Sequence, residues 1–212
     1  MARKTKEDAE ITYTVLLDAA EQVFFEKGVA RTTLNDIAAA AGMTRGAIYW
    51  HFKDKGDLLQ ALFDRALLPM EAMLNELPEC TCQDALGTLR QLFIHAFTQL
   101  GQSERQQRVL GIMFHKCEST GDQQAVMQQE IQHRDACLAQ CQGILQSAVD
   151  QGQLPADTDV FLSLQAVHNF IVGTMHQWLL TPQRYALDKV APALVDMLLA
   201  GLRTHPPRRA AA

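Results

Sequence analysis

The chain has 212 residues, of which 48% are hydrophobic and 20% charged, and its formal net charge is −5. That length and apolar content are enough for one or two domains with a sizeable core. The sequence has no apolar run of membrane-spanning length and no apolar segment after its charged first residues, so we expect no membrane contact, no secretory signal and a cytoplasmic location. The acidic net charge does not by itself suggest nucleic-acid binding.

The first expected element is a helix over residues 7–27, which Gly28 ends. Its apolar side chains recur at helical spacing and should form one buried face. That face comprises Ile11, Val15, Leu16, Ala19, Ala20, Val23 and Phe24.

Residues 33–55 predict two short helices separated by a glycine turn. Thr33 can cap the first helix, with Asp36 completing a shortened capping box, and Gly42 supplies the tight turn that ends it. Thr44 can then cap the second helix. The side chains expected to hold the pair together are Leu34, Ile37, Ala38, Ala41, Met43, Ile48 and Phe52. Two short helices joined by a tight turn are typical of a DNA-reading motif.

The outward residues of the second helix, at about 45–51, suit a DNA major groove. Arg45 can pair with a guanine edge or a phosphate, and Gly46 lets the backbone approach the duplex. Lys55 and the start of the next helix can share a phosphate. The predicted DNA-contacting residues are Thr33, Thr44, Arg45, Gly46, Tyr49, Trp50, His51 and Lys55. The alternative is a helical hairpin that only packs.

The rest of the chain is predicted to be helical, so the expected fold is all-α. Residues 54–77 form a long helix in which Pro69 should cause a kink or break near 65–68. Further helices are expected at about 83–101, 104–118, 122–151, 158–181 and 187–203. The predicted domains are a DNA-binding domain at 1–54, a helical ligand-binding and dimerisation domain at 55–205, and a disordered tail at 206–212.

The last two helices carry broad apolar stripes that one small domain can hardly cover. We therefore expect a homodimer, and the alternative is an ordinary monomeric core. Two reading helices per particle would suit a palindromic operator in double-stranded DNA.

A set of sulfur-containing, aromatic and imidazole side chains predicts a pocket for a hydrophobic small-molecule inducer. The set is Met70, Met73, Phe93, Phe97, Met113, Phe114, Cys137, Cys141, Phe170, His176 and Trp178. The alternative is that these residues form an ordinary core.

Metal or thiol sensing is a rival interpretation, because His133, Cys137 and Cys141 follow one another at intervals of four residues. These three positions span about 12 Å, too far for one metal ion, so no metal or cofactor is expected. The sequence also has no phosphate-binding glycine loop, nucleophile elbow or His-Glu-x-x-His motif, so we do not expect an enzyme.

The run TTLNDIAAAAGMTRGAIYWHFKDKGDLL closely resembles the helix-turn-helix signature of the tetracycline-repressor (TetR) family of bacterial regulators. The resemblance is strong over residues 5–60. The opening MARKTKE and the short segments 114–118, 152–155 and 178–180 resemble the branch that represses multidrug efflux pumps. This resemblance implies a repressor of an efflux-pump operon that leaves its operator when a drug-like ligand fills a C-terminal pocket, with the 54–77 helix carrying the signal. The alternative is a regulator of the same family that senses a metabolite, a metal or thiol oxidation.

Overall fold

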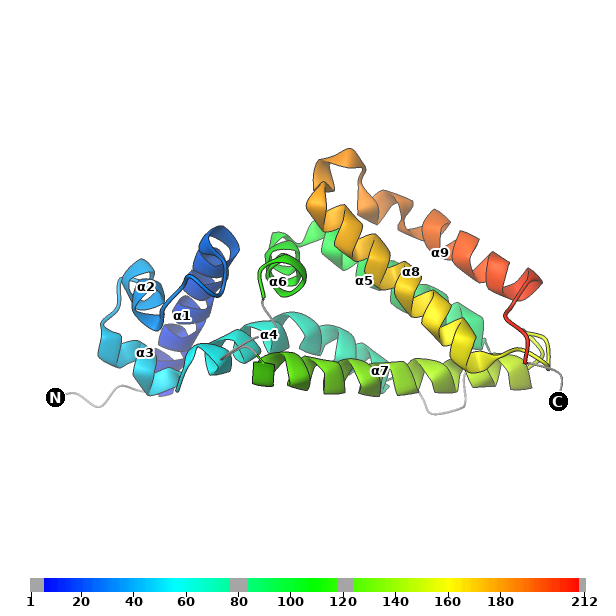
Figure 1. Ribbon diagram of the computed structural model, residues 1–212, viewed down its shortest axis with the longest axis horizontal. Helices are drawn as coiled ribbons and strands as arrows, with labels where there is room; N and C mark the ends of the chain where they lie inside the picture. The colour runs from blue at the N-terminus through cyan, green and yellow to red at the C-terminus, as the bar shows by residue number, and fades with distance from the viewer. Residues whose placement is uncertain (1–5, 77–83, 118–123, 210–212) are drawn as a thin grey trace. The chain divides into compact units, whose positions relative to one another are not determined.

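The computed structural model describes residues 6–76, 84–117 and 124–209, with the side chains of 68–76 and Ala125 left out of the description. Within these ranges the regular elements are helices, which confirms the all-α prediction (Figure 1). In chain order they are α1 Lys6–Lys27, α2 Leu34–Ala40, α3 Arg45–His51, α4 Lys55–Glu76, α5 Ala85–Gln102, α6 Glu104–His115, α7 Gln124–Asp150, α8 Val160–Leu180, the short 3₁₀ helix η2 Pro182–Arg184, and α9 Leu187–Thr204. None of the described helices is long and apolar enough to cross a membrane.

The chain divides into two compact units. The first comprises Met1–Leu68 and Arg105–Ile131, and the second comprises Pro69–Glu104 and Gln132–Ala212. The helices of the predicted DNA-reading motif therefore share a unit with the first part of α4, nearly all of α6 and the start of α7. The continuous helices α4 and α7 each contribute to both units.

The core of the first unit is built from α1 to α4, and α6 adds side chains to it. Its large, fully buried side chains include Phe24, Ile37, Ile48, Phe52 and Phe63. Helices of seven residues such as α2 and α3 are not stable alone in water. Burial of Ile37 and Ile48 in this core therefore holds the two short helices in place.

The buried face of α1 differs from the prediction near its N-terminus. Ile11 is 58% exposed and Val15 is 38% exposed, so their predicted inward positions are wrong. Leu17 is buried instead, and the ring of Tyr13 stacks on Phe52 with 5.1 Å between ring centroids. The apolar stripe thus passes through positions 13, 17, 20 and 24, and Ile11 and Val15 lie outside it.

α4 runs from Lys55 to Glu76 as one helix, so the break that was one alternative near 65–68 is wrong, and the kink stays a prediction. A proline inside a helix removes one backbone hydrogen bond and costs about 3 kcal/mol. Burial of Leu58, Leu59 and Leu62 in the first unit offsets this cost. The boundary between the two compact units nevertheless falls immediately before Pro69.

In the second unit, α5, α8 and α9 pack along one another (Figure 1). Phe97 of α5, Val167 of α8 and Val195 of α9 are buried in its core. A side chain at Gly101 would bring its Cβ to 2.8 Å from the backbone nitrogen of Asp188. A glycine is therefore needed where the end of α5 passes the start of α9.

The C-terminal segment is held in place through residue 209, contrary to the disorder predicted for 206–212. The Asp159 N–H donates to the Pro207 carbonyl over 2.8 Å, and the Arg209 N–H donates to the Asp157 carbonyl over 2.9 Å. Thr158 and Arg208 form an antiparallel β-bridge between these bonds. The segment therefore pairs with the loop that leads into α8. Residues 210–212 lie outside the described part of the chain.

Candidate nucleic-acid interface

The caps predicted for the two short helices are confirmed. The Asp36 N–H donates to Thr33 Oγ1 over 3.2 Å, and the Thr33 N–H donates to Asp36 Oδ2 over 2.8 Å. This capping box is reinforced by the Thr33 hydroxyl, whose hydrogen bond lowers the pKa of the Asp36 carboxyl. At α3, the Ala47 N–H donates to Thr44 Oγ1 over 3.3 Å. Gly42 between the helices has a φ of 65°, which favours glycine.

α3 has one buried and one exposed side. Ile48 is completely buried against the core, whereas Tyr49 is 46% exposed and Trp50 is 73% exposed. Arg45 and Gly46 are also exposed. A Cβ at Gly46 would meet only its neighbour Thr44 Oγ1, at 3.9 Å, so packing inside this protein does not require a glycine there. The exposed side of α3 is therefore accessible to a macromolecular partner.

An open hollow of about 270 Å³ lies beside this exposed side. We call it the basic hollow, and its lining residues are Thr32, Thr33, Leu34, Tyr49, Lys53, Asp54 and Lys55. The Lys55 ammonium donates to the Val29 carbonyl over 3.0 Å, which anchors it and leaves two N–H groups for other acceptors. The structure thus brings the predicted residues Thr33, Tyr49 and Lys55 together. It adds Lys53, a basic residue that was not among the predicted DNA-contacting residues.

The predicted residue His51 is half-buried in an aromatic cluster. Its ring centroid lies 5.8 Å from that of Tyr13 on α1 and 4.5 Å from that of Trp50. Burial, followed by the charges of Asp57 and Asp64, raises the pKa of Tyr13, so its hydroxyl stays protonated at neutral pH. His51 therefore connects α3 to α1 and contributes a smaller exposed surface than Tyr49 or Trp50.

A cluster of ion pairs fixes α1 against α4 and α6 within the first unit. The buried carboxylate of Glu21 lies 2.8 Å from Arg65 Nη2, 2.6 Å from Arg108 Nε and 3.4 Å from Arg105 Nε. Asp18 pairs with Arg65 and Arg105. The sequence interpretation did not identify this cluster. The signal was available, because a glutamate on the apolar stripe of α1 needs a charged partner.

The residues predicted to bind a ligand are distributed over both units. Phe93 and Phe97 of α5, Cys141 of α7 and Trp178 of α8 are buried in the second unit. The Trp178 indole N–H donates to the Tyr185 carbonyl over 2.9 Å. The half-buried members are Met113, Phe114, Cys137, Phe170 and His176. Met113 packs against the core of the first unit. The side chains of Met70 and Met73 lie outside the described part of the chain.

Burial makes Cys117 and Cys141 poor candidates for thiol chemistry. It raises the pKa of the Cys141 thiol to about 11, and it raises that of Cys117 to about 12 with a further contribution from the charge of Glu130. The reactive species of cysteine is the thiolate, which such values make scarce at neutral pH. This argument does not extend to Cys80 and Cys82, which lie outside the described residues.

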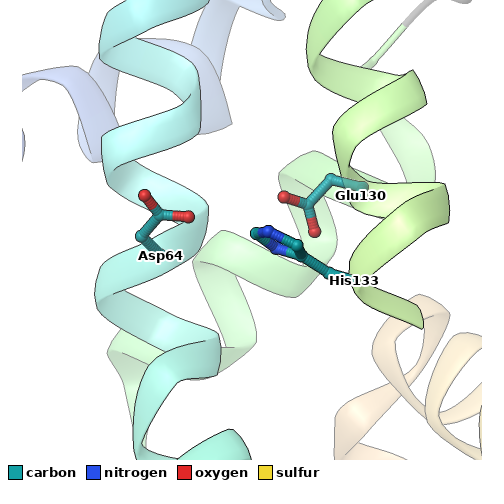
Figure 2. Close-up of side chains that lie close together, drawn as sticks. All are labelled: Asp64, Glu130 and His133. Carbon is teal, nitrogen blue, oxygen red and sulfur yellow. The ribbon is translucent and has the colours of Figure 1, made fainter. Parts of the chain in front are cut away.

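A polar cluster of α4 and α7 lies near the cysteine-bearing part of α7. The Gln60 side-chain amide donates to Asp64 Oδ1 and to Glu130 Oε1, over 2.8 Å in each case. Figure 2 shows these two carboxylates with His133, which follows Glu130 by one turn of α7. The Gln60 amide therefore bridges the carboxylates of Asp64 and Glu130.

Two family models match this chain. Residues 16–62 match the family described as bacterial regulatory proteins, tetR family. Residues 84–204 match the C-terminal region of MAATS-type transcriptional repressors. The first match contains α2, α3 and the basic hollow, and the second covers α5 to α9.

Individual proteins match nearly the whole chain. The HTH-type transcriptional regulator TtgR of Pseudomonas putida is 38% identical over 99% of this chain and 100% of its own length. The structure of NalD, the secondary repressor of the MexAB-OprM multidrug efflux pump in Pseudomonas aeruginosa, matches with a TM-score of 0.80 and 31% identity over 94% of this chain and 100% of NalD. A SmeT–triclosan complex matches with a TM-score of 0.75 and 34% identity over 90% and 91% of the two chains. SmeT is the repressor of the Stenotrophomonas maltophilia multidrug efflux pump SmeDEF.

Proposed function

The chain belongs to the TetR family of bacterial regulatory proteins, which are transcriptional regulators and not enzymes, and we propose that it represses a multidrug efflux operon. In this proposal a homodimer binds a palindromic operator, and a hydrophobic drug-like compound in the C-terminal helices releases it. A repressor of a bacterial operon acts where the chromosome lies, in the cytoplasm.

The observation that carries the DNA-binding part is the exposed side of α3 beside the basic hollow. Arg45 can donate two parallel hydrogen bonds to a guanine edge, which is the commonest specific protein–DNA contact. The ammonium groups of Lys53 and Lys55 can neutralise a phosphate at the hollow and fix the register of α3 on the duplex. Trp50, which is 73% exposed, offers an apolar surface for a thymine methyl group.

The dimer part is supported by apolar side chains that remain exposed in the second unit. TetR-family repressors act as dimers. Phe161 is 60% exposed and Leu180 54% exposed on α8, and Met197 is 59% exposed on α9. Exposed large apolar side chains on neighbouring helices are typical of a protein interface. We propose that this surface of α8 and α9 pairs with its copy and so presents two α3 helices to two half-sites.

Similar proteins support the proposals that this chain controls an efflux operon and that it binds a hydrophobic ligand. NalD and SmeT are repressors of multidrug efflux pumps, and SmeT has been solved with triclosan. We propose that this chain binds a compound of similar hydrophobicity among α5, α7 and α8, where the aromatic members of the predicted ligand set are Phe93, Phe97, Phe170 and Trp178. Such a compound releases DNA only if it binds the DNA-incompetent arrangement more tightly than the competent one.

Mapping the chromosomal sites that the protein occupies in its own cell tests this proposal. We expect palindromic sites next to the genes of a transporter. Purified protein should lose affinity for those sites when hydrophobic antibiotics such as triclosan raise its thermal midpoint. Arg45→Ala should weaken operator binding by about 1–3 kcal/mol. Arg134→Ala is the matched control. Arg134 is an exposed arginine of α7, and its substitution should not weaken operator binding.

Two results would contradict different parts of the proposal. Sites that adjoin only metabolic genes, with no response to any hydrophobic compound, would rule out the efflux function and leave DNA binding intact. Equal operator affinity of the Arg45→Ala variant and the wild type would rule out the assignment of α3 as the reading helix.

A further inference from the structure

The exposed side of α3 contains a contact between two of its own side chains. The guanidinium carbon of Arg45 lies 5.3 Å from the centroid of the Tyr49 ring. The two residues are four positions apart on one helix, so their side chains are neighbours on its surface. A guanidinium at this distance from an aromatic face is attracted by the ring quadrupole. Within the described part of the chain, Arg45 has no carboxylate partner that would compete for it.

Tyr49 also lines the basic hollow, together with Lys53 and Lys55. The same side chain therefore borders the proposed phosphate position and contacts the proposed base-reading arginine. Asp54, the one acidic residue of the lining, accepts a hydrogen bond from the N–H of Asp57 at the start of α4, over 2.9 Å.

We infer that Tyr49 is a positioning residue for base recognition, whose ring holds the Arg45 guanidinium in the orientation that α3 presents to a base edge. This inference rests on the proposed DNA-binding function and adds a determinant of sequence specificity to it. A long, unrestrained arginine loses conformational entropy when it binds a base. Stacking of Arg45 on Tyr49 before DNA binds removes part of this entropic cost. The ring of Tyr49 thus contributes to specificity through Arg45.

The Tyr49 hydroxyl allows this role to be separated from a simple phosphate contact. A phosphate contact needs the hydroxyl, whereas the contact with Arg45 needs only the aromatic ring. If the ring positions Arg45, Tyr49→Phe should preserve specificity because phenylalanine keeps the aromatic face. Tyr49→Leu removes that face while retaining an apolar side chain of similar reach. Because Tyr49 is 46% exposed, neither change should prevent folding, and the thermal midpoint verifies this for each variant.

The experiment measures binding to two probes, a duplex that the wild-type protein selects from a randomised library and a duplex of random sequence. We expect Tyr49→Leu to lower the ratio of the affinity for the selected duplex to the affinity for the random duplex by about three- to thirtyfold, the range that a cation–π contact supports. Tyr49→Phe should keep the wild-type value of this ratio, whatever affinity it loses for both duplexes. In an Arg45→Ala background, Tyr49→Leu should cause no further loss of specificity.

Three results would overturn the inference. Tyr49→Phe could lower the ratio of selected-duplex to random-duplex affinity as much as Tyr49→Leu does, which would assign the effect to the hydroxyl. In the double variant, the losses of specificity caused by Tyr49→Leu and Arg45→Ala could multiply, which would show that the two residues act independently. If the wild type selects no sequence at all, the proposed DNA-binding function fails together with the inference, whereas the first two results leave that function standing.

Discussion

Arg65 of α4 and Glu21 of α1 form a buried ion pair, with 2.8 Å between Arg65 Nη2 and Glu21 Oε2. The Glu21 side chain is only 3% exposed, and Arg105 and Arg108 of α6 lie against the same carboxylate. A buried charge that loses its partners is left without compensation. α1 therefore cannot move away from α4 and α6 without separating these charges.

Glu21→Gln should destabilise the protein by about 3 kcal/mol, because it removes the buried carboxylate that Arg65, Arg105 and Arg108 share. Urea unfolding followed by circular dichroism measures this loss. Asp18→Asn is the matched control, since Asp18 pairs with Arg65 and Arg105 but is 47% exposed, and its loss should stay within about 1 kcal/mol. Equal losses of stability in the two variants would show that the burial of Glu21 does not increase the contribution of its ion pairs.

Phe161→Glu should dissociate the proposed dimer. Each copy would place an unpaired carboxylate in the interface, at a cost of about 3 kcal/mol or more. The fold of the protomer should persist, because Phe161 is 60% exposed within it. Sedimentation at low micromolar concentration measures the state of association.

The matched control for the dimer is Ile11→Glu, which introduces the same charge at a residue of α1 that is 58% exposed. This variant should remain dimeric. If both variants stay dimeric, the interface lies on a different surface from the one that contains Phe161.

Deleting residues 206–212 should lower the stability of the second unit. The deletion removes the two backbone hydrogen bonds that join Pro207 and Arg209 to residues 157–159, and each such bond contributes about 1 kcal/mol. It also removes the ion pair between Arg208 and Asp157. Deleting only residues 210–212 is the control. A full deletion that unfolds at the same temperature as this control would show that the paired segment contributes nothing.

The elements governed by local sequence signals could be predicted. The capping residues Thr33 and Thr44 satisfy backbone N–H groups of the helices that follow them, and Gly42 allows the positive φ of the turn. These interactions span at most four residues, so the sequence contains all the information needed to place α2 and α3. The exposure of Tyr49 and Trp50 followed from the burial of Ile48 on the opposite side of the same short helix.

The features that depend on distant contacts could not be predicted. The exposure of Ile11 depends on where Tyr13 meets Phe52, a partner at the end of α3. The helical continuity at Pro69 depends on the burial of the preceding turns of α4. The C-terminal segment is ordered because of residues 157–159, some fifty positions earlier. Lys53 joins the basic hollow only because α2, α3 and α4 meet there.

Cys117 and Cys141 should resist alkylation in the folded protein. Their thiol pKa values, raised by burial to about 12 and about 11, leave little thiolate at about pH 7.5. Iodoacetamide at that pH should therefore label both residues slowly until urea unfolds the chain, as peptide mass spectrometry can follow. Rapid labelling of either residue, accompanied by loss of DNA binding, would favour the thiol-sensing alternative over drug sensing.

His168 of α8 should make the protein less stable in mild acid. Burial, followed by the positive charge of Arg134 on α7, lowers the pKa of this imidazole below its ordinary value of 6.5, although a hydrogen bond with Asn169 opposes the shift. The unfolded chain therefore binds a proton more readily than the folded one. The free energy of unfolding keeps its full value above about pH 6.5 and falls as the pH drops toward the folded-state pKa. Thermal midpoints measured from about pH 7.5 to about pH 5 should show a smaller decrease for His168→Gln than for the wild type. Arg134→Gln should reduce the decrease in part, because it removes the second cause of the shift. A wild-type decrease that persists unchanged in both variants would assign the acid sensitivity to other groups.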